Sequence, residues 1–185
     1  RGVRQYGLSV EQWIRIFNYI KSEGVTRIRF TGGEAFLRRD IEELYFAATS
    51  LGLEPSIVTN GISISSKHYK WLKKSRPTVV WISIYGYPAS IYEFVCGRKG
   101  SFEYATDVIR KLVAADIDVG LYYPLGECTD RGIVPFLRYA YKLGVRMVIF
   151  LQVLPHGRSA EQRGMGSLPQ ERLGHTLDRI VDECK

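Results

Sequence analysis

Hydrophobic positions along the chain recur with two alternating spacings, one typical of helices and one typical of strands. The first helical face carries Val10, Trp13, Ile14 and Phe17. Ser9 directly precedes this stretch and Gln12 lies three residues later inside it, which is the spacing of a capping box. Gly24 follows the stretch and is a typical residue at a helix end. A helix is therefore predicted from about residue 9 to residue 24.

Short runs rich in β-branched and aromatic residues separate the helical stretches. They are residues 25–30, 54–59, 78–84, 117–123 and 146–153. Strands that alternate with amphipathic helices predict βαβ crossovers and a parallel sheet. Both an open doubly wound sheet and a barrel fit this pattern. A complete eight-unit barrel takes roughly 250 residues, so a barrel here would be incomplete.

Several helix boundaries are predicted from local signals. Asp40 is expected to cap a helix that ends near Gly52, and residues 65–75 are expected to form the next helix. Ser167 with Gln170 has the spacing of a second capping box, before the last helix. The stretch between the third strand and the helix that carries Phe102 is interpreted as a loop.

Composition is that of an ordinary globular protein, and residues 1–185 are predicted to form a single domain. Of the residues, 45% are hydrophobic and 24% are charged. The net charge of +7 indicates a weak attraction for anions, but the basic residues are spread along the chain and no RNA-binding aromatic motif occurs, so nucleic acid is not an expected partner. The longest apolar stretch, residues 147–154, is too short to cross a membrane, so no membrane partner is expected.

The three cysteines, Cys96, Cys128 and Cys184, lie far apart in the sequence. No pair has the CxxC spacing of a metal knuckle, and nothing indicates a disulfide framework. Free thiols of this kind are typical of a reducing compartment, which favours a cytoplasmic location. No residue of the chain is predicted to bind a metal, and no catalytic residue is assigned.

Glycine and polar residues follow every predicted strand. The strand ends read Thr31-Gly32-Gly33-Glu34, Thr59-Asn60-Gly61, Ser83-Ile84-Tyr85-Gly86, Pro124-Leu125-Gly126-Glu127 and Pro155-His156-Gly157-Arg158. Turn chemistry explains some of them, because glycine, proline and asparagine end strands in many proteins. In both candidate folds, however, ligands bind at the carboxyl ends of the strands. Glycine-bearing ends on one rim therefore favour a ligand site.

The Gly32-Gly33 pair predicts a ledge of exposed backbone. Glycine has no Cβ, so a ligand can approach the N–H and C=O groups closely, and Glu34 adds an acceptor suited to an ammonium group. The sequence contains neither the GxxxxGK[ST] nor the GxGxxG phosphate motif. The ledge thus fits the aminocarboxylate end of an amino acid; the alternative is a tight bend with Glu34 in solvent.

Three segments resemble those of radical S-adenosylmethionine (SAM) enzymes of the peptide-maturase, cofactor-maturase and molybdenum-cofactor branches. They are "IRFTGGEAFLRRDI", "WISIYGYPASIYEFVCGRKGSFEYATDVIRKL" and "FLQVLPHGRS", and the resemblance runs from about residue 9 to residue 165. It implies a partial (β/α)6 TIM-like barrel whose parallel strands bind SAM at their carboxyl ends. The residues that match the family's SAM contacts are Gly32, Gly33, Glu34, Asn60, Ser83, Val153 and Gly157.

The family's chemistry also depends on a CxxxCxxC loop that holds a [4Fe–4S] cluster, and this sequence has no such triplet. In the family the loop precedes the helix that starts here near Ser9, so the first strand and the cluster loop are expected to lie outside this chain. The resemblance then implies a parent enzyme that generates a 5′-deoxyadenosyl radical and modifies a peptide or cofactor precursor, with a ferredoxin or flavodoxin as electron donor. This fragment alone is expected to be inactive.

Two other functions remain open from the sequence. One is a cluster-free barrel that keeps the ledge as a binding module for SAM or an amino-acid-like ligand. The other is an unrelated barrel enzyme such as an aldolase, which ranks last because no strand interior offers a lysine.

Overall fold

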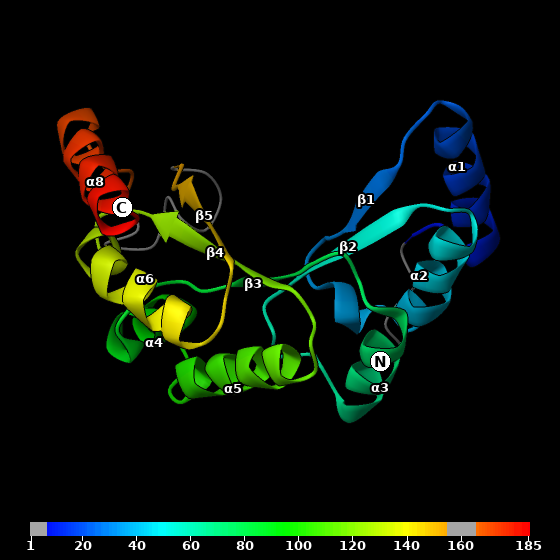
Figure 1. The fold of residues 1–185 in the computed structure, drawn as a ribbon, viewed down its shortest axis with the longest axis horizontal. Helices are drawn as coiled ribbons and strands as arrows, with labels where there is room; N and C mark the ends of the chain where they lie inside the picture. Colours follow the sequence, from blue (N-terminus) through cyan, green and yellow to red (C-terminus); the bar gives the residue numbers. More distant parts are fainter. Residues whose placement is uncertain (1–6, 155–165) are drawn as a thin grey trace.

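A curved sheet of five parallel strands forms the centre of the protein, with helices along its outer side (Figure 1). The structure is a computed structural model and describes residues 7–154 and 166–185. The strands are β1 (Arg27–Phe30), β2 (Glu54–Thr59), β3 (Val80–Ser83), β4 (Val119–Leu125) and β5 (Met147–Gln152). Each lies within two residues of the boundaries expected from the hydrophobic runs.

The strand order identifies the sheet as part of a barrel. Each strand pairs in parallel with the next one along the chain, in the order β1-β2-β3-β4-β5. A doubly wound sheet would reverse its order at a switch point and carry helices on both faces. Here the order never reverses and the helices lie on the convex side (Figure 1). The partial TIM-like barrel is confirmed, and the described residues contain five of the six strands expected of a (β/α)6 barrel.

The helices of the outer layer follow the strands in sequence. They are α1 (Val10–Ser22), α2 (Ile41–Ser50), α3 (Ser66–Ser75), α4 (Ala89–Cys96), α5 (Ser101–Ala114), α6 (Ile133–Lys142) and α8 (Gln170–Glu183). Two short 3-10 turns, η1 (Ala35–Leu37) and η2 (Asp130–Gly132), stand just before α2 and α6.

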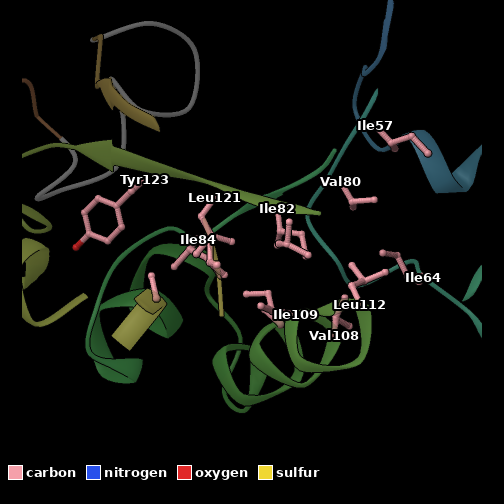
Figure 2. Packing of buried hydrophobic residues seen from close by; sticks show 14 of the residues in the cluster. Ile57, Ile64, Val80, Ile82, Ile84, Val108, Ile109, Leu112, Leu121 and Tyr123 are labelled. Atoms are coloured by element: carbon pink, nitrogen blue, oxygen red, sulfur yellow. The ribbon is translucent and has the colours of Figure 1, made fainter. Parts of the chain in front are cut away.

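Side chains alternate between the two faces of the sheet, as the pleat of a strand requires. On the convex face, Val80, Ile82 and Leu121 are fully buried and lie above Val108, Ile109 and Leu112 of α5 (Figure 2). The intervening residues point to the opposite side. We call that side the concave face; across β1–β4 it carries Arg27, Arg29, Ser56, Val58, Trp81, Ser83, Gly120 and Tyr122.

Local capping signals were correct at the first helix and wrong at two others. The Ser9–Gln12 capping box is present, with Ser9 N donating to Gln12 Oε1 at 2.8 Å. Asp40 directly precedes α2 but makes no side-chain cap. Its carboxylate is instead paired with Arg38, whose Nε lies 2.6 Å from Oδ1. An ion pair two residues away therefore replaces the predicted cap.

The second predicted capping box is also wrong. α8 begins at Gln170 after Pro169, and the hydroxyl of Ser167 donates to the backbone oxygen of Val153 at 2.6 Å. Ser167 ties the last helix to the end of β5 and does not cap it. The expected loop after the third strand contains the helix α4, whose short apolar pattern gave too little periodicity to predict it.

Two observations concern the environment of the protein. No helix within the described parts of the chain has both the length and the apolar character needed to cross a membrane. Cys96, Cys128 and Cys184 are all free thiols, as expected from their spacing. The cytoplasmic location stays a prediction.

Candidate functional site

The ledge after β1 is open backbone. Gly32 and Gly33 are both exposed, and a Cβ built on either residue meets no heavy atom within 4 Å. Gly32 has a φ of +147°, a conformation that residues with side chains rarely adopt. The two glycines thus leave free space beside the peptide groups at the carboxyl end of β1, as the sequence predicts.

Glu34 joins the end of β1 to the end of β2. Its Oε1 accepts hydrogen bonds from Thr59 Oγ1 at 2.7 Å and from Phe36 N at 3.1 Å. Its Oε2 accepts one from Asn60 N at 2.8 Å. The alternative of a solvated glutamate is therefore wrong. Because a carboxylate has about four acceptor positions, Oε2 keeps capacity for one further donor.

Asn60 and Ser83 continue this rim onto the next strands. Asn60 Oδ1 accepts a hydrogen bond from Ile62 N at 2.8 Å, which fixes the turn after β2. Ser83 is the last residue of β3 and follows Ile82, the register partner of Thr59. The structure thus brings Gly32, Gly33, Glu34, Asn60 and Ser83 to one edge of three neighbouring strands.

Val153 lies at the same edge but on the far side of the sheet. It follows β5, is 9% exposed, and donates its backbone N–H to Leu125 at 2.9 Å. β4 separates β5 from β3, so Val153 does not contact the ledge. Gly157, the last of the predicted site residues, lies outside the described residues.

A cluster of three side chains on the concave face was not predicted from the sequence. The guanidinium of Arg29 lies 5.4 Å from the ring centre of Trp81, and its Nη1 donates to the hydroxyl of Tyr122 at 2.5 Å. The rings of Trp81 and Tyr122 stack at 4.9 Å with an interplanar angle of 28°. The alternation of side chains along a strand was the available signal, because it puts the neighbouring Tyr122 and Tyr123 on opposite faces, and Tyr123 is fully buried on the convex side.

A hollow of about 460 Å³ lies on the concave side, at the end of the strands opposite the ledge. It is lined by Arg27, Ile28, Arg29, Glu54, Ser56, Thr78, Val79 and Trp81. These residues stand at the amino ends of β1–β3, whereas ligands of parallel α/β proteins bind at the carboxyl ends. The ledge is an open shelf and the hollow is a separate feature beneath it.

The described residues do not fit an iron–sulfur cluster. In the described ranges, no three His, Cys, Asp or Glu side chains come together as a metal site. Burial raises the pKa of the Cys96 and Cys128 thiols, which disfavours the thiolate that a cluster requires. Cys184 is exposed and directly follows α8.

Comparison with known proteins decides the family. The model of the radical SAM superfamily matches residues 1–140. The chain belongs to the radical SAM superfamily. It is 32% identical over 178 residues to the PqqA peptide cyclase of Rhizobium meliloti, and 29% identical over 154 residues to the sporulation killing factor maturation protein SkfB of Bacillus subtilis.

These relatives are much longer than the chain. The match covers 96% of this chain and 47% of the cyclase, and 83% of this chain and 37% of SkfB. The chain therefore spans less than half the length of either radical SAM relative.

Two solved structures with bound S-adenosylmethionine have the same fold. The structure of Streptococcus suis SuiB bound to S-adenosylmethionine superposes with a TM-score of 0.79 at 16% identity, over 98% of this chain and 42% of SuiB. The structure of anSMEcpe with bound AdoMet and Kp18Cys peptide gives 0.76 at 18% identity, over 96% of this chain and 52% of that chain. At these identities the likeness establishes the architecture alone.

Proposed function

We propose that this chain is the SAM-binding core of a radical SAM enzyme that modifies a peptide. The observation that carries the proposal is the open Gly32-Gly33 ledge, held against β2 by Glu34, in a chain of this superfamily. The relatives named as a PqqA peptide cyclase and as a sporulation killing factor maturation protein support a peptide as the substrate class over a cofactor precursor.

Each predicted residue has a distinct part in holding SAM. The bare peptide groups of Gly32 and Gly33 receive the amino end of the methionyl moiety, and the free acceptor position on Glu34 Oε2 receives one of its N–H groups. Asn60 and Ser83 flank the ribose and methionyl parts from β2 and β3. Val153 is proposed to lie on the adenine side, and the resemblance assigns the same role to Gly157, which is outside the described residues. The same hydrogen bonds that use most of the acceptor capacity of Glu34 also keep it from moving.

The chemistry beyond binding comes from groups outside this chain. A [4Fe–4S] cluster held elsewhere in the parent protein would supply the electron that breaks a C–S bond of SAM, and hydrogen abstraction from the substrate would depend on that chemistry. The described residues contain no ligand set for the cluster, so its ligands are proposed to lie elsewhere in the parent protein, and a ferredoxin or flavodoxin is proposed to reduce it. What this chain contributes is orientation and the exclusion of competing reactions.

Replacing Gly33 with alanine tests the ledge directly. The added methyl group meets no atom within 4 Å, so the protein should fold with unchanged stability. It would, however, occupy the space that the ligand needs, and SAM binding measured by equilibrium dialysis on the full-length protein should weaken at least tenfold. Gly174→Ala is the matched control, because its methyl group also meets nothing, on α8. Equal SAM affinity in both variants would contradict the assignment of the ledge.

The radical reaction needs a separate measurement. Anaerobic iron and sulfide analysis of the full-length protein should find the cluster, and reduction in the presence of SAM should yield 5′-deoxyadenosine. SAM binding without iron or sulfide would instead favour the cluster-free binding module.

A further inference from the structure

The concave face carries a cationic group whose partners are all uncharged. Arg29 is exposed and forms no ion pair within residues 7–154 and 166–185. Arg27, two residues earlier on the same face, differs in this respect, since its Nε lies 3.0 Å from Glu54 Oε2. A guanidinium has five N–H donors. Arg29 gives one to Tyr122 and makes a long contact of 3.4 Å with Ser56 Oγ.

The position of the guanidinium is fixed by the aromatic pair beneath it. Trp81 stacks on Tyr122 and presents its ring to Arg29, an arrangement in which the cation is attracted to the ring face. Trp81 can lie flat against β4 because its register partner is Gly120. A Cβ at that position would stand 2.5 Å from the ring atoms Cε3 and Cζ3. The sequence therefore holds Arg29 in a defined place and not as a mobile surface cation.

The donors that remain free suit a carboxylate. Tyr122 accepts a hydrogen bond from Arg29 and keeps its own O–H to donate. Arg29 and Tyr122 thus offer adjacent donors, and arginine binds carboxylates with two parallel hydrogen bonds. Open space borders the cluster, since Arg29 and Trp81 line the hollow of about 460 Å³.

The cluster lies next to the proposed SAM site. Tyr122 is the register partner of Ser83, and Trp81 precedes Ser83 by two residues on the same face. A substrate that reaches SAM along the inside of the partial barrel would pass over these side chains. We propose that Arg29, Trp81 and Tyr122 form a receptor for a carboxylate of the peptide substrate. The inference rests on the proposed function and specifies an acidic group in that substrate.

A matched pair of probes tests the receptor on the full-length protein under anaerobic conditions. N-acetylglutamate α-amide carries the carboxylate, and N-acetylglutamine α-amide has the same shape without the charge. Ligand-observed NMR titration should show that the acid binds at least tenfold more tightly than the amide. Arg29→Met should weaken binding of the acid at least tenfold, because a charged hydrogen-bonded pair is lost.

Two further variants separate the receptor from general charge effects. Tyr122→Phe keeps the stacked ring and removes one donor, so binding of the acid should weaken threefold to tenfold. Arg27→Met removes the same charge from the same strand but leaves the cluster intact, and affinity should stay within twofold. Equal binding of acid and amide would overturn the proposal, and so would an equal loss of affinity for the acid in Arg27→Met and Arg29→Met.

SAM itself contains a carboxylate, so its affinity is measured on the same variants. The SAM affinity of Arg29→Met should stay within twofold of the wild-type value, while its affinity for the acid probe falls at least tenfold. A loss of SAM affinity as large as the loss of probe affinity would assign the cluster to SAM and refute a substrate receptor. Failure of the wild-type protein to bind SAM at all would instead refute the proposed function.

Discussion

The two faces of the central sheet use neighbouring residues for different purposes. On the convex face, Ile82, Leu121 and Tyr123 are fully buried under the helices and pack among apolar side chains (Figure 2). On the concave face, the next residues along the same strands include Ser83 and Tyr122, which are only partly buried, and Tyr122 accepts a hydrogen bond from Arg29. A single strand therefore supplies the core and the candidate site in alternation.

The difference shows where stability and function reside in this fold. Burial of the convex side chains holds the helices onto the sheet, since each buried aliphatic side chain contributes roughly 1.5–3 kcal/mol. On the concave face Arg29 is exposed and Ser83 and Tyr122 are only partly buried, so these three side chains are accessible to a ligand. Substitutions on the two faces should consequently affect different measurements.

The largest effect should come from truncation on the convex face. Leu121 is fully buried, so Leu121→Ala should lower the free energy of unfolding by about 2–5 kcal/mol, measured by urea denaturation. Leu151 on β5 lies on the concave side and is 50% exposed. Leu151→Ala should therefore change the free energy of unfolding by less than about 1 kcal/mol. If the two variants were equally destabilised, the concave face would be a packed core like the convex one.

The alternation that separates the faces was visible in the sequence. The strand runs, the helix between Ser9 and Gly24, and the glycine-bearing strand ends all depend on local patterns. The structure confirms the strands, the helix and the first four strand ends, and the fifth, residues 155–158, lies outside the described residues. The partial barrel also follows from the resemblance to radical SAM enzymes. Asp40 and Ser167 were misjudged because the partners that compete for their side chains, Arg38 and Val153, are specified by the folded chain and not by spacing.

The contacts of the site residues were less predictable than their positions. Gly32, Gly33, Glu34, Asn60 and Ser83 were placed on one edge from motif order alone. The use of both Glu34 oxygens by β2 depends on how β1 and β2 align, which no local signal encodes. Arg29 meets Tyr122 across two intervening strands and 93 residues, so the concave cluster could be found only in the structure.

A smaller effect on stability should come from crowding the concave face at Gly120. In Gly120→Ala the new methyl group would meet the Trp81 ring, and the ring must shift from Tyr122. We expect a loss of about 1–3 kcal/mol in the free energy of unfolding. The indole N–H resonance of Trp81, assigned with Trp81→Phe, should move while those of Trp13 and Trp71 stay in place. An unshifted Trp81 resonance would show that the stack does not depend on the glycine.

The smallest expected effect on stability concerns the hydroxyl of Tyr69 on the convex side, whose surroundings differ from those of the Tyr122 hydroxyl. In the described structure, the buried hydroxyl of Tyr69 on α3 has no hydrogen-bond partner, whereas Tyr122 accepts a bond from Arg29. Burial, with smaller contributions from Tyr104 and Asp107, raises the pKa of Tyr69 from 10.0 to about 12. Between these values the unfolded chain loses the proton that the folded chain keeps, so stability falls as the pH rises from about 10 towards 12.

Tyr69→Phe should make that decline shallower in urea denaturation at stepped pH values, with little change at pH 7. Tyr141→Phe, at a residue that is 83% exposed, should leave the decline as in the wild type; a Tyr69→Phe profile parallel to that of Tyr141→Phe would show that the Tyr69 hydroxyl does not contribute to the alkaline loss of stability.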